Sequence, residues 1–222
     1  MSATTHVRQH NSMLAATEKR LLVWIAERLP RWINPDHLSV LGLAAMAGAG
    51  VSFWVAQSDP VVGALLVVLC LLLNWFGDSL DGTVARVRDQ QRPRYGYYVD
   101  HVIDLAGTAL MFAGLAASGY MSPAIATLVV AAFFLVSAET YLATHARGVF
   151  KMAFIGVGPT ELRILLAAGA LALINSPTVD FGLGQVLLWD IGGLIGAIGM
   201  ALTFIVSSAQ NVRALYVEET RR

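Results

Sequence analysis

Long apolar stretches separated by short polar loops constrain this chain more than any other feature. Six of them fall at about 37–57, 61–77, 97–118, 124–145, 162–174 and 186–208. A bilayer core is about 30 Å thick and is crossed by roughly 20 helical residues, so most of these stretches match a membrane span. Only 14% of the residues are charged, against roughly 25% in an ordinary soluble domain. The sequence therefore predicts an all-α integral membrane protein with six transmembrane helices, the fifth being the shortest.

The segment before the first apolar stretch is amphipathic. Between Ala15 and Trp32, leucine and tryptophan side chains are interleaved with Glu, Lys and Arg. This pattern is typical of a helix that lies in the membrane interface, although a helix packed on a soluble partner is the alternative. We expect residues 1–34 to form a cytoplasmic N-terminus with an interfacial helix, 35–213 a six-helix membrane domain, and 214–222 a cytoplasmic tail. The polar first residues also lack the apolar core of a signal peptide.

The placement of charge predicts the orientation of the chain. All 15 Lys and Arg residues fall on one side of the six-span layout, whereas the opposite loops hold Asp59 and Asp180 and no basic residue. Because basic loops face the cytoplasm, we expect both termini and the acidic segment after the second span to be cytoplasmic, in the cell membrane if the protein is bacterial. The net charge of zero gives no bulk field that would recruit nucleic acid. The single cysteine, Cys70, excludes a disulfide framework and a thiolate metal site.

Four aspartates follow the second span and open the third. Asp78 and Asp81 are three residues apart, and Asp100 and Asp104 are four apart, so each pair shares one face of a helix. Carboxylates are costly near hydrocarbon unless they are paired or bind cations. All-oxygen ligation suits Mg²⁺ or Mn²⁺ rather than zinc. The spacing favours a metal site; in the alternative interpretation, the aspartates cap helices or pair with the arginines of a solvated loop.

Small residues surround these carboxylates. Gly82 and Ala85 remove bulk from one helical face, which would let a flat group or a phosphate chain approach the backbone. Arg86 adds a planar cation suited to phosphate at the edge of that face. Gly96 lies one turn before Asp100. Each small residue taken alone is more typical of helix packing in a membrane protein.

Together these positions form a pattern with fixed spacing. It reads Asp78-x2-Asp81-Gly82-x2-Ala85-Arg86-x9-Gly96-x3-Asp100-x3-Asp104. The pattern resembles the signature of the CDP-alcohol phosphatidyltransferase family (class I), with every fixed position present, and the six-span layout and N-terminal helix are similar to the family as well. The resemblance implies an enzyme of phospholipid biosynthesis that joins a CDP-linked alcohol to a hydroxyl acceptor at the bilayer and releases CMP. It also implies a homodimer.

The resemblance assigns roles to the motif residues. Two ions, Mg²⁺ or Mn²⁺, would be bound by Asp78, Asp81, Asp100 and Asp104. The catalytic residues would be Asp100 and Asp104, with Asp104 as the general base on the acceptor hydroxyl. The cytidine diphosphate would be bound by Asp81, Gly82, Ala85, Arg86 and Gly96.

The acceptor site is less constrained. Arg147, Lys151 and Arg163 would suit a phosphorylated acceptor such as inositol phosphate or glycerol phosphate, but they also fit cytoplasmic anchors of the spans. His101, after Asp100, and Glu161 in a Thr-Glu pair resemble elements of choline and ethanolamine phosphotransferases. That subgroup would use a CDP-amino alcohol and diacylglycerol. In the plainer interpretation, His101 faces the interface and Glu161 caps the fifth membrane helix.

A cation transporter or channel is the alternative from another functional class. Its acidic cluster would form the ion site, which should lie near the bilayer midplane on broken helices. Here the carboxylates crowd one membrane face, and Gly82, Ala85 and Arg86 have no purpose in a transporter. The sequence therefore favours the enzyme.

Overall fold

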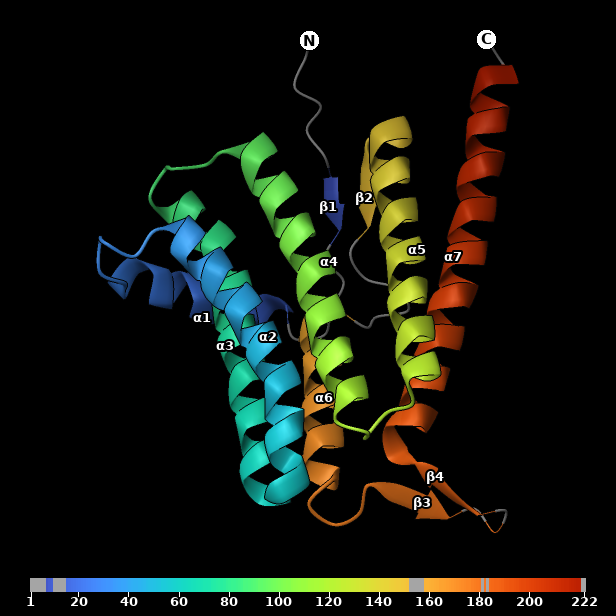
Figure 1. Ribbon diagram of the computed structural model, residues 1–222. Coiled ribbons are helices and arrows are strands. Elements are labelled where there is room, and N and C mark those ends of the chain that lie inside the picture. The colour runs from blue at the N-terminus through green and yellow to red at the C-terminus, as the bar shows by residue number, and fades with distance from the viewer. Residues whose placement is uncertain (1–6, 10–14, 152–157, 181, 183, 221–222) are drawn as a thin grey trace.

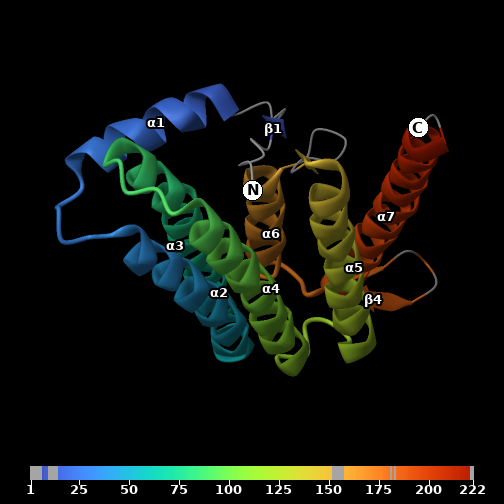
Figure 2. The same cartoon turned by 90° about the horizontal axis from the view of Figure 1, so that it is seen from above.

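The computed structural model describes residues 7–9, 15–151, 158–180, 182 and 184–220, and helices dominate this part of the chain. Helix α1 (Ala15–Arg28) lies crosswise to the other helices, on the flank of the molecule beside α2 and α3 (Figure 1). The other helices run up and down the bundle: α2 (Pro35–Ser58), α3 (Pro60–Val87), α4 (Pro93–Ala117), α5 (Pro123–Arg147), α6 (Pro159–Ala172) and α7 (Leu188–Thr220). Seen from above, α1 runs beside α3, and α5 and α7 lie on the opposite side of the bundle (Figure 2).

Prolines mark where the helices of the bundle begin. Helices α2 to α6 each start with a proline, which fits this place because proline fixes φ and the first helical N–H has no partner within the helix. Asn34 adds a cap before α2: its Oδ1 accepts a hydrogen bond from the backbone N of His37 at 2.9 Å. These prolines and the Asn34 cap lie in the polar loops of the sequence, and they determine the residue at which each helix begins.

Five helices among the described residues, α2, α3, α4, α5 and α7, are long and apolar enough to cross a membrane. Helix α6 has 14 residues, which corresponds to a length of about 21 Å and is shorter than a bilayer core of about 30 Å. Six spanning helices therefore stay a prediction, and so does the interfacial position of α1. Helix α7 continues to Thr220, through most of the segment expected to be a tail.

Two small sheets accompany the helices. Strand β1 (Val7–Gln9) pairs in parallel with β2 (Val149–Lys151), and β3 (Thr178–Asp180) pairs antiparallel with β4 (Gln185–Leu187). The first sheet lies beside α5, and the second lies at the opposite end of the bundle (Figure 1). These strands were not expected from the sequence, because three residues are too few to show the alternation of polar and apolar side chains that marks a strand.

Glycines let α2 pack closely against both helices that carry the aspartates. A Cβ added to Gly77 of α3 would lie 2.5 Å from the backbone oxygen of Leu38 on α2. A Cβ added to Gly114 of α4 would lie 2.5 Å from the backbone of Gly50, also on α2. Small residues of this kind let helix backbones approach in membrane proteins. Helix α2 thus holds α3 and α4 in fixed positions relative to each other.

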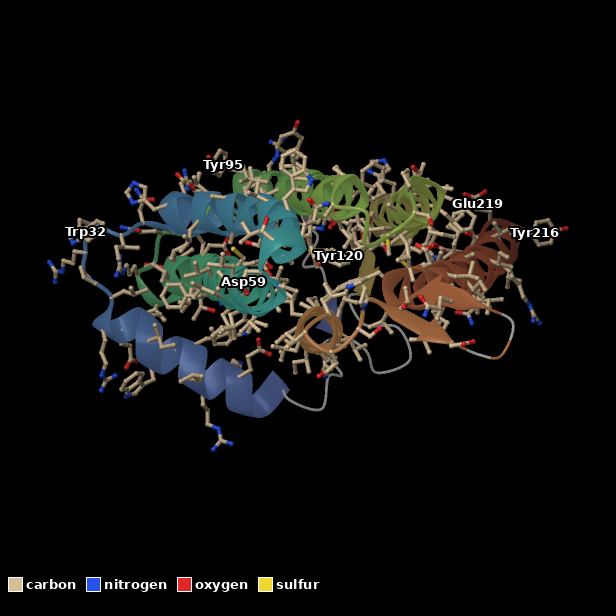
Figure 3. The ribbon with its side chains drawn as sticks, turned by 60° about the horizontal axis from the view of Figure 1, so that its bottom comes forward. Trp32, Asp59, Tyr95, Tyr120, Tyr216 and Glu219 are labelled. Atoms are coloured by element: carbon tan, nitrogen blue, oxygen red, sulfur yellow. The ribbon has the colours of Figure 1, made fainter. Side chains whose placement is uncertain are left out.

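The apolar core lies between these helices and α7. Phe53, Met111 and Leu115 are buried, and the ring of Trp189 from α7 meets Phe53 edge-on with 5.2 Å between centroids. A second cluster forms where α1 contributes Leu22 and Ala26 against α2 and α3. Outside these clusters, Trp32 and Tyr216 project away from the helices (Figure 3), with 74% and 71% of their surface exposed.

A polar contact joins α5 to α7 within the apolar surroundings. Glu139 of α5 is buried, and its two carboxylate oxygens accept hydrogen bonds from Ser207 Oγ at 2.8 Å and Asn211 Nδ2 at 2.6 Å, both on α7. A buried carboxylate is costly unless its oxygens are satisfied. The two donors on α7 therefore fix the pairing of these helices.

Candidate functional site

Three of the four motif aspartates converge. Asp78 comes from α3, and Asp100 and Asp104 come from successive turns of α4. Each offers a carboxylate oxygen, and these oxygens all lie within 4.8 Å of one another. Asp100 and Asp104 share one face of α4 because they are four residues apart. The packing of α3 and α4 on α2 brings Asp78 next to this pair. Such an all-oxygen donor set fits a hard divalent cation such as Mg²⁺ or Mn²⁺.

Asp81 faces a different neighbour. Its Oδ2 accepts a hydrogen bond from Ser39 Oγ of α2 at 2.6 Å, and its Oδ1 accepts from the backbone N of Gly82. Among the described residues, the group of clustered carboxylates contains the other three aspartates and leaves Asp81 out. Its metal-binding role stays a prediction. Ser39 was not identified from the sequence, where nothing distinguishes it from other small residues of the first apolar stretch.

Arg163 and Asn74 complete the surroundings of Asp78. Arg163 of α6 donates from Nη2 to Asp78 Oδ2 at 2.5 Å and from Nε to Asn74 Oδ1 at 2.7 Å. The sequence placed Arg163 near the acceptor, and the structure brings it directly to the carboxylates. Asn74 was missed, although an asparagine inside an apolar run, one turn before Asp78, was a visible signal.

The small residues of the motif leave one side of the α3 terminus and the α4 start open. A Cβ on Gly82 would find the Arg86 guanidinium as its nearest neighbour, with Nη1 at 3.3 Å, and one on Gly96 would meet no other described residue within 4 Å beyond its own helix. Arg86 is exposed and donates from Nη2 to Thr83 Oγ1 at 2.9 Å. Ala85 is partly exposed next to it. This arrangement agrees with an approach of a phosphate chain, but the nucleotide role of these residues stays a prediction.

His101 is held between α4 and α5. Its ring lies over Tyr97 with 4.1 Å between centroids and meets Tyr141 of α5 edge-on at 4.8 Å. Its Nδ1 is 2.7 Å from the backbone oxygen of Tyr97 and 3.8 Å from Asp100 Oδ2. With 15% of its side chain exposed, His101 lies beside the carboxylates and does not face outward.

The remaining acceptor candidates have other contacts. Glu161 Oε2 accepts a hydrogen bond from the backbone N of Gly158 at 3.0 Å, so Glu161 caps the start of α6 as the plainer interpretation expected. Its Oε1 is buried without a hydrogen-bond partner among the described residues. Arg147 donates to Asn211 Oδ1 of α7. Lys151 belongs to β2, and its side chain lies outside the described part of the structure.

Comparisons with known proteins place this geometry in context. The model of the CDP-alcohol phosphatidyltransferase family matches residues 32–205. Two similar solved structures are both of Mycobacterium tuberculosis phosphatidylinositol phosphate synthase (PgsA1). The structure with CDP-DAG bound has a TM-score of 0.56 and 20% identity, covering 87% of this chain and 92% of that one. The structure with manganese and citrate has a TM-score of 0.56 and 19% identity, covering 88% of each chain. No curated protein sequence matches significantly.

Proposed function

Because the chain belongs to the CDP-alcohol phosphatidyltransferase family, we propose that it transfers a substituted phosphate from a CDP-alcohol to an acceptor hydroxyl with the help of divalent cations. Membership makes it a membrane transferase of phospholipid synthesis, and its long apolar helices agree with this. The convergence of Asp78, Asp100 and Asp104 is the observation that carries the metal-dependent part of the proposal.

The carboxylates would hold two cations, Mg²⁺ or Mn²⁺. Asp78, Asp100 and Asp104 supply the clustered oxygens, and Asp81 would join them by turning from Ser39. When bound, the cations supply charge that neutralises the pyrophosphate and the leaving CMP. Support also comes from the solved structure of the similar mycobacterial synthase, which is a complex with manganese.

Asp104 would act on the acceptor. The acceptor oxygen attacks the phosphorus that carries the alcohol, a new P–O bond forms, and the P–O bond to the departing CMP breaks. The proton of the acceptor hydroxyl passes to a carboxylate oxygen of Asp104. A positioned base of this kind contributes roughly 10²–10⁴-fold to rate. Asp100, one turn away on α4, would help to keep the acceptor hydroxyl and the phosphate close together and correctly oriented.

The open face formed by Gly82, Ala85 and Gly96 would receive the cytidine diphosphate, with Asp81 at its edge. Support comes from the space at Gly96, where a Cβ would meet no described residue within 4 Å outside its own helix, and from the exposure of Arg86. A planar guanidinium binds phosphate oxygens in a bidentate way, so Arg86 would contact the diphosphate. The acceptor would approach the carboxylates near His101, which lies beside Asp100, or near Arg163, which contacts Asp78.

We favour CDP-diacylglycerol as the donor and a polar alcohol as the acceptor. The solved structure of the similar synthase contains CDP-DAG. Transfer from a CDP-amino alcohol to diacylglycerol is the second candidate: that subgroup would have His101 close to the acceptor, and His101 lies beside the carboxylates, 3.8 Å from Asp100. In both cases the active site and both termini would be cytoplasmic. The homodimer and the extent of each domain also stay predictions.

Measurement of CMP release tests the proposal. Purified full-length protein in lipid nanodiscs is given CDP-diacylglycerol with a panel of alcohols, and separately CDP-choline or CDP-ethanolamine with diacylglycerol. We expect CMP from the first series, dependent on added Mg²⁺ or Mn²⁺ and abolished by EDTA. CMP from the second series alone would favour the second candidate. No CMP from any pairing, or CMP release unaffected by EDTA, would contradict the metal-dependent reaction.

A further inference from the structure

A buried asparagine outside the signature motif connects three helices next to the carboxylates. Asn74 of α3 has 7% of its surface exposed and lies one turn before Asp78. Its Nδ2 donates to the backbone oxygen of Gly42 on α2 at 3.1 Å, and its Oδ1 accepts from Arg163 Nε of α6 at 2.7 Å. Both ends of the amide are therefore engaged, which fixes its orientation.

Arg163 carries this orientation to Asp78. The guanidinium is planar, and its N–H groups point in fixed directions. Holding Nε on Asn74 therefore limits where Nη2 points, and Nη2 donates to Asp78 Oδ2 at 2.5 Å. The side chains of Arg163 and Asp78 are 15% and 24% exposed, so water competes little for this contact. Because Oδ2 is held, the direction of the other carboxylate oxygen is set as well.

We propose that Asn74 is a positioning residue of the metal site: through Arg163 it holds the Asp78 carboxylate in the orientation that binds a divalent cation. This inference rests on the proposed metal-dependent function. Outer partners of ligating carboxylates are important for metal sites, and their loss costs about 10–100-fold in metal affinity or activity. Asn74 is uncharged, so replacing it changes the orientation of Arg163 and Asp78 without changing the charge of the site.

The test measures Mn²⁺ binding directly, without turnover. Free Mn²⁺ is followed by electron paramagnetic resonance during titration of the full-length protein in nanodiscs. We expect Asn74→Leu, which keeps the size of the side chain and removes its hydrogen bonds, to bind Mn²⁺ at least about tenfold more weakly. Arg163→Lys keeps the positive charge but lacks the planar fork, and it should show a loss of the same order. If Asn74→Leu does not fold, the Mn²⁺ affinity of Arg163→Lys is the measurement that tests the proposal.

The double variant separates positioning from a general effect on packing. Asn74 and Arg163 act through one path to Asp78, so the combined loss in Asn74→Leu/Arg163→Lys should be close to that of one substitution and well below the sum. The matched control is Asn211→Leu. Asn211 also joins helices through its amide, between Glu139 and Arg147, and it should bind Mn²⁺ with wild-type affinity when replaced.

The outcomes separate the inference from the proposed function. Wild-type protein that binds Mn²⁺ together with an unchanged affinity in Asn74→Leu overturns the positioning role alone. Fully additive losses, or an equal loss in Asn211→Leu, also overturn it, because a general weakening of the bundle would produce them. Wild-type protein that does not bind Mn²⁺ overturns the metal-dependent function itself and the inference with it.

Discussion

Among the clustered carboxylates, Asp104 is the one to which the proposed reaction gives a proton. Asp104→Asn keeps the size and an oxygen donor but cannot accept the proton from the acceptor hydroxyl. We expect kcat for CMP release to fall by about 10²–10⁴-fold at saturating Mn²⁺. Asp180→Asn is the control, because Asp180 is an exposed carboxylate in β3 at the other end of the bundle. Wild-type turnover in Asp104→Asn would contradict its role as the base.

Spacing along one helix made the acidic cluster predictable, whereas contacts between helices were not. Asp100 and Asp104 share a face by helix geometry alone, so the sequence was enough to pair them. The contacts of Ser39 with Asp81 and of Arg163 with Asn74 join residues 42 and 89 positions apart. They depend on how α2, α3 and α6 pack, and no local pattern reports that packing.

At the scale of elements, the segment that follows α1 is anchored to the bundle by Arg88, the residue that caps the end of α3. Arg88 donates from Nη1 to the backbone oxygen of Ile33 at 2.6 Å and from Nη2 to that of Leu29 at 2.8 Å. Both oxygens belong to the segment that connects α1 to α2, outside either helix. Hydrogen bonds to a charged group contribute about 1.5–3 kcal/mol. We expect Arg88→Ala to lower the opening free energy of residues 15–33 by this amount, measured by hydrogen exchange in nanodiscs.

Arg28→Ala provides the comparison for α1. Arg28 lies over the Trp24 ring at 4.3 Å and donates to the Trp24 backbone oxygen, so both contacts stay within α1. Its replacement should leave the exchange of residues 15–33 nearly unchanged. Equal exchange in the wild type and Arg88→Ala would show that α1 is held by its other contacts, which are the buried Leu22 and Ala26 and the hydrogen bonds that Glu18 accepts from Trp75 and Thr160.

The helix boundaries show which signals the sequence contains. Apolar runs located the helices of the bundle, because hydropathy is a local property of the sequence. The last turns of α7, after Asn211, were assigned partly to a tail because they are polar. Helix α3 continues to Val87, past both Asp78 and Asp81, so the carboxylates lie inside a helix. Continuation of a helix beyond its apolar part depends on backbone hydrogen bonding, which hydropathy does not register.

At the scale of the whole molecule, the helices run alternately up and down, so polar segments that follow successive helices lie at opposite ends of the bundle (Figure 1). The segment between α3 and α4 and the C-terminal end of α7 lie at the end that carries the acidic motif, and β3 and β4 lie at the other (Figure 1). All 15 basic residues fit one end in the six-span layout. If the acidic site and the end of α7 both face the cytoplasm, the short helix α6 must cross as well, because only four crossings after Gln90 return the chain to the same side.

Cysteine accessibility tests that crossing. Gln90, Ser176 and Thr220 are exposed and lie between α3 and α4, after α6, and at the end of α7. Each is replaced by cysteine in a Cys70→Ser background and treated with a membrane-impermeant maleimide in right-side-out and inverted vesicles. We expect Gln90→Cys and Thr220→Cys to react only in inverted vesicles and Ser176→Cys only in right-side-out ones, because positive loops stay cytoplasmic. Labelling of Gln90→Cys and Thr220→Cys from opposite sides would mean that α6 does not cross.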